Sequence, residues 1–303
     1  MTDAILDLID LDQKKVGYRE FLSCWVYRRD NLTFLVDPGP TSTISHLVDT
    51  LGELEVEKVD YILLTHIHLD HGGGVSELLK TFPDARVFCH DIGVRHIVDP
   101  SKLWKGSVQV LGETAKMYGE PGPIPAENMV DAEQLKAYGI QVIDTPGHAP
   151  HHVSFLVGDI LFAGEAIGTR VELASGRPYL RPATPPKFIL DGALASLDKL
   201  LALDPEPELV AFAHYGLTRD TFTWCRRARK QLVVWNETLR GLLKESEDNP
   251  EERFFSRLQE IDPLYGRGRF QELPADIAAR ERDFLANTMD GMRGYIKSSE
   301  GRL

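Results

Sequence analysis

The pattern of apolar positions divides the first 220 residues into short strand-like and helix-like segments. Apolar runs at 21–27 and 32–36 flank a turn at 29–31, which predicts a β-hairpin within residues 16–38. A Thr-Ser-Thr segment at 41–43 then predicts the start of a helix that continues to Leu51. Further strands are expected at 59–64, 86–89, 140–143, 153–157, 160–163 and, as the last strand, 209–213, with helices at 75–82, 92–98 and 188–203.

Two segments lack a regular apolar pattern. Residues 101–130 contain several glycines and prolines, which predicts a partly helical surface excursion. Residues 168–187 are rich in Arg, Pro and Gly and are interpreted as a loop.

The pattern becomes helical after residue 220. Apolar residues recur at spacings of three and four at 225, 228, 232, 235, 239 and 242, and again at 285, 289, 292 and 296. We therefore expect a main domain at 1–220 and a helical extension at 221–303, whose helices pack on each other and on the main domain. A lid over a site and a contact in a homodimer stay open as alternatives.

The composition narrows the classes of partner. The chain has 303 residues, 43% hydrophobic residues and a net charge of −12, which opposes binding to nucleic acid and to anionic membranes. The N-terminus is acidic where a secretory signal would be basic, and no apolar run approaches the ~20 residues that cross a bilayer. Three scattered cysteines fit a reduced compartment. These features predict a cytoplasmic protein that acts on a small molecule.

One segment carries most of the chemistry. His66, His68, Asp70 and His71 place four metal-ligand side chains within six positions, directly after the strand at 59–64. His66 and His68 alternate, so both rings point to the same side of an extended backbone. The glycines at 72–74 permit a sharp turn next to the other pair. The two neighbouring pairs can therefore serve two metal ions that lie side by side.

Three more ligand types occur at similar positions. His148 follows the strand at 140–143, Glu165 follows the strand at 160–163, and His214 follows the strand at 209–213. Four strands thus end in a residue that can bind metal. This predicts that all of them converge at one edge of a sheet assembly.

The combined motif resembles the metallo-β-lactamase superfamily. The resemblance covers about residues 15–220 and rests on His-x-His-x-Asp-His at 66–71, Thr-Pro-Gly-His at 145–148, Glu165 and His214, with an Asp-x-Gly turn at Asp37. It implies an α/β fold of the αββα sandwich type with two metal ions at one edge of the sheets. By this resemblance His66, His68 and His148 bind the first ion, and Asp70, His71 and His214 bind the second. Glu165 would bridge both ions, and Asp37 would hold one of the ligating histidines.

The bridging residue departs from the family pattern, in which aspartate is usual. Glu165 is longer by one methylene, so we expect a changed metal spacing or one weakened site. Some sulfate-ester hydrolases of the superfamily are similar in having glutamate here. Of two further histidines, His151 and His152, one can orient a substrate or a ligand.

The resemblance predicts hydrolysis by metal-bound hydroxide, with Asp70 as the catalytic residue that passes a proton to the leaving group. Mixed imidazole and carboxylate ligands suit zinc first, with iron or manganese as alternatives. We expect an ester or thioester substrate. A small-molecule phosphodiesterase and a non-catalytic binding or regulatory protein are the alternatives. Candidate substrate contacts, chosen because arginine pairs with carboxylates and phosphates, are Arg170, Arg177, Tyr179, Arg181 and Tyr215.

Overall fold

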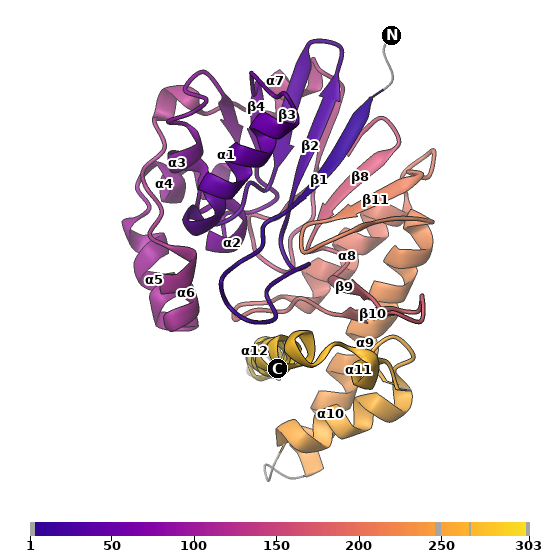
Figure 1. Ribbon diagram of the computed structural model, residues 1–303. Helices are drawn as coiled ribbons and strands as arrows, with labels where there is room; N and C mark the ends of the chain where they lie inside the picture. Colours follow the sequence, from indigo (N-terminus) through magenta and orange to yellow (C-terminus); the bar gives the residue numbers. More distant parts are fainter. Residues whose placement is uncertain (1–3, 246–249, 267, 301–303) are drawn as a thin grey trace.

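The chain forms four layers in the computed structural model, which describes residues 4–245, 250–266 and 268–300 (Figure 1). Two five-stranded sheets pack face to face, and helices cover the outer face of each sheet. The αββα sandwich that the sequence predicts is therefore confirmed.

The first sheet comes from the N-terminal half of the chain. Its strands are β1 (Ile5–Asp10), β2 (Ser23–Arg29), β3 (Leu32–Val36), β4 (Tyr61–Leu63) and β5 (Arg86–Phe88). They lie in chain order, with β1, β2 and β3 antiparallel and β3, β4 and β5 parallel. The parallel pairing brings the C-terminal ends of β3, β4 and β5 to one edge.

The second sheet comes from the other half of the main domain. Its strands are β6 (Ile140–Asp144), β7 (Val153–Val157), β8 (Ile160–Gly164), β11 (Leu209–Phe212) and β12 (Leu217–Arg219), and a separate hairpin is formed by β9 (Thr169–Glu172) and β10 (Pro178–Arg181). The order across the sheet is β12-β11-β8-β7-β6, and β8 and β11 are parallel. The ends of β8 and β11 therefore also meet at one edge.

The alternation of side chains along β2 shows how the layers are filled. Trp25 and Tyr27 point into the core between the two sheets, whereas Cys24 and Val26 point into the core under the helices. Because both faces of the strand are covered, apolar residues occupy consecutive positions instead of alternating with polar ones.

Helices cover both outer faces. The helices on the first sheet are α1 (Ile44–Glu53), α2 (Leu69–Gly72), α3 (Val75–Leu78), α4 (Asp91–Val98), α5 (Ser101–Leu111) and α6 (Glu113–Tyr118). The other helical elements of the main domain are the short 3₁₀ turns η1 (Thr41–Thr43) and η2 (Ala126–Asn128) and the helices α7 (Ala132–Lys136) and α8 (Leu190–Leu201). The segment 101–130 is thus mostly helical, in line with the sequence pattern. The second sheet is covered by α8 and by the first helix of the extension.

The C-terminal region consists of α9 (Thr221–Glu245), α10 (Pro250–Ile261), α11 (Arg269–Glu272) and α12 (Ala275–Glu300). The predicted apolar stripe of α9 is buried from Cys225 to Leu239, and Leu242 is partly buried. These side chains join the same core as Phe212 of β11 and Met292 of α12. The helices therefore pack on each other and on the second sheet.

Several predicted boundaries were wrong. The run at 209–213 is not the last strand, because β12 follows and pairs with β11. The segment 168–187 is not only a loop, because Thr169 and Val171 are buried in the hairpin of β9 and β10. The edge strand β1 was also missed, because two apolar residues precede each aspartate in its sequence, which gives no alternation with a period of two.

Among the described helices, none combines the length and the apolar character that crossing a membrane would require.

Candidate metal centre

The seven predicted ligands come together at the edge where four strands end. His66 and His68 lie in the loop after β4, and Asp70 and His71 lie in α2. The other three ligands follow strands of the second sheet, with His148 after β6, Glu165 after β8 and His214 after β11. Both sheets thus contribute side chains to one centre.

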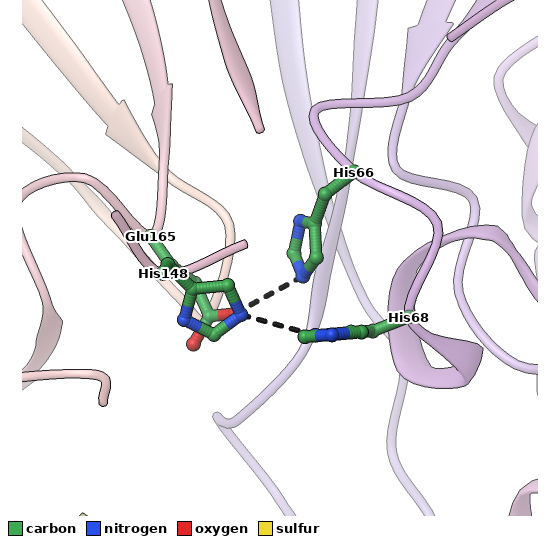
Figure 2. Close-up of side chains that lie close together, drawn as sticks. All are labelled: His66, His68, His148 and Glu165. Atoms are coloured by element: carbon green, nitrogen blue, oxygen red, sulfur yellow. Dashed lines mark hydrogen bonds and ion pairs between the residues drawn. The ribbon is translucent and has the colours of Figure 1, made fainter. Parts of the chain in front are cut away.

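Four of the ligands form a first cluster. Figure 2 shows His66 and His68 approaching from one side and His148 and Glu165 from the other. One ligand atom from each of these residues lies within 4.8 Å of all the others. Nε2 of His148 is 2.8 Å from Oε2 of Glu165 and 3.0 Å from Nδ1 of His68.

The other three ligands, Asp70, His71 and His214, form a second cluster with the same 4.8 Å limit. His214 Nε2 lies 2.8 Å from Oε1 of Glu165. Oε1 of Glu165 therefore faces the second cluster, whereas Oε2 lies between the first cluster and His71, 3.6 Å from Nε2 of that ring. The carboxylate thus lies between the two clusters.

Glu165 is charged although it is buried. Burial alone would raise the pKa of the carboxyl group, but the neighbouring His148 and His214 outweigh it and hold this pKa well below its usual range. A buried carboxylate surrounded by imidazole nitrogens is a favourable position for a cation.

Hydrogen bonds fix the protonated nitrogen of His66. Thr65 donates its hydroxyl proton to Asp37 at 2.6 Å, so the same hydroxyl accepts a hydrogen bond from Nδ1 of His66 at 3.1 Å. Nε2 of His66 then carries a lone pair and points at Glu165. Burial lowers the pKa of His66 well below its ordinary value, which keeps this ring neutral and able to bind metal.

Asp37 supports ligands of both clusters. Its backbone has a φ of 53°, and its carboxylate accepts the backbone N–H of Thr65 at 2.8 Å. The other oxygen lies 3.4 Å from Nδ1 of His71. Burial opposes the charged form of His71, but the carboxylates of Asp70 and Asp37 raise its pKa to about 9. The structure thus places Asp37 beside a predicted ligand.

His152 holds the backbone of Glu165. Its Nδ1 donates to the carbonyl oxygen of Thr145 at 3.0 Å, and its Nε2 accepts the backbone N–H of Glu165 at 2.9 Å. Burial, together with nearby His148, lowers the pKa of His152 to about 3, so the ring is neutral. A Cβ atom at Gly164 would lie 2.3 Å from this Nε2, and the φ of Gly164 is 58°. Glycine is therefore required before the bridging residue.

The residues present fit metal ions. In the described part of the chain, His66 Nε2, His71 Nε2 and His214 Nδ1 are buried nitrogens without a hydrogen-bond partner. His66 Nε2 lies 3.2 Å from a glutamate oxygen, a contact between two acceptors that a cation stabilises and a hydrogen bond does not explain. Neither cluster includes a cysteine, so the donors are imidazole and carboxylate groups.

Most of the candidate substrate contacts have partners within the protein. Arg170 pairs with Glu172 at 2.8 Å, and Arg177 pairs with Glu272 of α11. Tyr215 is partly buried beside His214.

The other two candidates lie inside the protein. Tyr179 is fully buried near Tyr265, and Arg181 forms a buried ion pair with Glu281 of α12 at 2.6 Å. Contact of these five residues with a substrate stays a prediction.

Sequence reasoning named Asp37 and the pair His151 and His152 as candidates for orienting a ligand, but it missed two other groups. Thr65 directly precedes the ligand motif, which could have indicated its role. The carbonyl oxygen of Ala183, which lies 3.0 Å from Nδ1 of His148, has no signal in the sequence because any residue supplies a carbonyl.

Comparisons with known proteins give the family. The sequence model of the metallo-beta-lactamase superfamily matches residues 17–214. The chain therefore belongs to the metallo-β-lactamase superfamily, as its ligand motif predicts.

Two relatives illustrate the range of the family. Over 211 residues the chain is 31% identical to the metallo-beta-lactamase fold-containing protein ST1585 of Sulfurisphaera tokodaii, a match that covers 67% of this chain and 76% of that protein. It is 30% identical to a hydroxyacylglutathione hydrolase of Aeromonas salmonicida, a match that covers 66% of this chain and 64% of that enzyme. The chain thus spans slightly less than two thirds of the hydrolase.

Solved structures confirm the fold beyond the matched family region. The crystal structure of ST1585 from Sulfolobus tokodaii has a TM-score of 0.66 and 24% identity, and the alignment covers 95% of this chain and 98% of the other. The metallo-beta-lactamase family protein TTHA1429 from Thermus thermophilus has a TM-score of 0.64 and 20% identity, covering 97% and 94% of the two chains. These alignments include the C-terminal helices.

Proposed function

We propose that this protein is a hydrolase that uses two divalent metal ions and cleaves an ester, with a thioester as the favoured substrate. The observation that carries the proposal is the position of the Glu165 carboxylate, with one oxygen 2.8 Å from His148 and the other 2.8 Å from His214. The carboxylate thus lies between two clusters of imidazole and carboxylate ligands and contacts both, an arrangement that suits a pair of ions.

The residues divide into two sets. His66, His68 and His148 would hold the first ion, and Asp70, His71 and His214 would hold the second, with Glu165 shared. When bound, two such ions activate water as a nucleophile near neutral pH and polarise the oxygen of the bond that is cleaved. Zinc is the metal we expect first, because the donors are imidazoles and carboxylates.

Asp70 is the proposed proton carrier. The side chain of Asp70 keeps 15% of its surface exposed, whereas His71 and Glu165 are more deeply buried. A carboxylate at the open side of the centre can accept a proton from water and deliver it to the leaving group. We therefore assign the general acid and base role to Asp70.

The relatives support a thioester as the first substrate class to test. A hydroxyacylglutathione carries its acyl group on sulfur, and a hydrolase of that compound is 30% identical to this chain. A thiolate is a good leaving group, so the proton from Asp70 would matter less for a thioester than for an oxygen ester. Replacing Asp70 should therefore slow the hydrolysis of an oxygen ester more than that of a thioester, which allows one variant to distinguish the two substrate classes.

The experiment is a metal analysis followed by a substrate comparison. We expect about two equivalents of zinc, iron or manganese in purified protein, lost in His68→Ala. The metal-loaded protein should hydrolyse acyl thioesters faster than matched oxygen esters, phosphodiesters or lactones. Asp70→Asn should lower turnover on the order of 100-fold, the size of a general acid-base contribution, with little change in the unfolding temperature.

Three outcomes would contradict the proposal. Full turnover in Asp70→Asn would remove Asp70 from the chemistry. Background rates on every ester class with two metals bound would favour a binding or regulatory protein. Absence of metal after reconstitution would contradict the assignment of the ligands.

A further inference from the structure

The ring of His148 is held by a segment that belongs to neither sheet. Nδ1 of His148 donates a hydrogen bond to the carbonyl oxygen of Ala183 at 3.0 Å. This bond fixes the protonated nitrogen and leaves Nε2 free to face Glu165. The position of the 182–185 segment, which follows β10, therefore controls the direction of a predicted metal ligand.

Helix α12 holds this segment by hydrogen bonds. The hydroxyl of Thr184 donates to the carbonyl oxygen of Thr288 at 2.8 Å, and the hydroxyl of Thr288 donates to the carbonyl oxygen of Pro182 at 3.3 Å. Thr184 and Thr288 are both buried. The two bonds therefore attach Pro182 and Thr184, the residues before and after Ala183, to α12.

Close packing of the backbones adds to these bonds. A Cβ atom at Gly291 of α12 would lie 2.1 Å from the carbonyl oxygen of Thr184 and 2.5 Å from that of Pro185. The helix can approach the segment this closely only because residue 291 is glycine. The buried ion pair between Arg181 and Glu281 joins the same two elements at the start of the segment.

The same helix reaches the other cluster through an aromatic contact. Arg280 donates to the carbonyl oxygen of Gly17 at 2.8 Å, and its guanidinium group lies 4.3 Å from the ring centre of Phe21. Phe21 in turn lies 4.6 Å from the ring of His214, centre to centre. Figure 1 shows α12 below the strands, near the loop that joins β1 to β2.

We propose that α12 is a positioning element of the metal centre, acting on His148 through the 182–185 segment. The helix lies outside the matched family region of 17–214, yet it contacts the segment that is bonded to the His148 ring. The inference rests on the metal site of the proposed function, but it does not depend on the reaction or its substrate.

The helix offers a matched pair of variants. Gly291→Ala places a methyl group against the 182–185 segment, whereas Gly294→Ala, one turn further along, has no atom within 4 Å. Both substitutions exchange glycine for alanine inside the same helix and gain the same helix propensity. Any difference between the two variants therefore comes from the contact with the segment.

Two measurements test the proposal without any assay of turnover. The first is the Nδ1–H resonance of His148 in Zn²⁺-loaded protein, from ¹H–¹⁵N NMR of histidine-labelled samples, which reports the hydrogen bond to Ala183. The second is Co²⁺ affinity, from competition with a chelator. We expect Gly294→Ala to match the wild type. Gly291→Ala should shift or lose this Nδ1–H resonance and bind Co²⁺ about 10- to 100-fold more weakly, the usual effect of removing a group that orients a ligand.

A wild-type Nδ1–H resonance of His148 and wild-type Co²⁺ affinity in folded Gly291→Ala would overturn the proposal. If Gly291→Ala does not fold, Thr184→Val and Thr184→Ser replace it. Valine removes the hydroxyl that bonds to Thr288, and serine keeps it. Weaker Co²⁺ binding in the valine variant, restored in the serine variant, supports positioning by α12, whereas equal affinity in both contradicts it. A protein without hydrolytic activity would show the same contrasts, so failure of the proposed reaction is distinguishable.

Discussion

Glu165 reaches both clusters from the end of β8, where the pairing with β11 shifts register. From the extra methylene we predict a changed metal spacing or one weakened site. In the structure the backbone N–H of Glu165 is fixed by His152, and the carboxylate extends between His148 and His214 at 2.8 Å from each. The glutamate side chain is therefore long enough to contact both clusters.

Gly164 is the residue whose replacement tests this arrangement. Gly164→Ala combines a left-handed φ of 58° with a contact of 2.3 Å to His152, whereas Gly158→Ala has nearly the same φ, 60°, and no atom within 4 Å. We expect Gly158→Ala to lower the free energy of unfolding by about 1–2 kcal/mol through backbone strain alone. Gly164→Ala should cost clearly more and should also reduce bound metal, because Glu165 moves with its backbone.

Urea denaturation and metal analysis of the two variants provide the comparison. Equal losses of stability and unchanged metal content in both would show that the contact with His152 does not position Glu165.

The ligands were predictable at the level of single residues because they occupy strand ends. His66, His68, Asp70 and His71 are neighbours in the sequence, and the strands of the second sheet bring His148 and His214 to the same edge. Asp37 and the pair His151 and His152 were named from sequence as candidates for orienting a ligand, whereas Ala183 could not be, since it acts through its carbonyl. Arg181 could not be assigned from sequence either, because its partner Glu281 lies 100 residues away.

At the scale of elements, a buried charge cluster joins the β9–β10 hairpin to α12. Glu281 accepts from Arg181 at 2.6 Å and lies 3.2 Å from Arg280, and all three side chains are almost fully buried. Burial opposes ionisation of Glu281, but the two arginines outweigh it and hold its pKa below the ordinary 4.5. The contribution to stability is therefore complete above pH 4.5 and is lost as the pH falls below that value.

Glu281→Gln leaves two buried cations without their counter-charge. We expect the free energy of unfolding at pH 7 to fall by about 3–5 kcal/mol, the usual cost of breaking a buried pair from one side. Glu245→Gln breaks a pair of similar length, 2.7 Å to Arg253, in which both side chains are exposed, and should change stability little. Urea denaturation at pH 7 measures both variants, and a small loss in Glu281→Gln would mean that the arginines find other partners.

The elements that the sequence pattern identified are those buried on one or two faces. The hairpin of β2 and β3 has continuous apolar runs because both faces of its strands are buried, and the helix α9 has a clear apolar period because one face is buried. The sequence pattern did not identify the strands β9 and β10, because their segment is rich in Arg, Pro and Gly, which are more typical of loops. The burial of β10 depends on α12 and α9, which follow it in the chain, so local pattern could not reveal it.

At the scale of the whole molecule, the helical region and the second sheet share one core. Phe212 of β11, Leu197 of α8, Trp235 of α9 and Met292 of α12 belong to a single continuous cluster of buried residues. Hydrogen bonds cross the same boundary, since Gln231 of α9 donates to the carbonyl oxygen of Leu180 at 2.7 Å. A core that spans both regions couples their unfolding.

Two tryptophans can report separately on the unfolding of the sheets and of the C-terminal helices. Trp25 lies between the sheets and donates to the carbonyl oxygen of Phe212, whereas Trp235 lies in α9 and donates to Asp262. With fluorinated tryptophan, each gives a separate ¹⁹F resonance that a Trp→Phe variant assigns. We expect both native resonances to disappear at the same urea concentration in metal-free protein, because the C-terminal helices share their core with the second sheet. Loss of the Trp235 resonance while that of Trp25 persists would show that these helices unfold as a separate unit, and α12 could then leave the metal centre without unfolding the sheets.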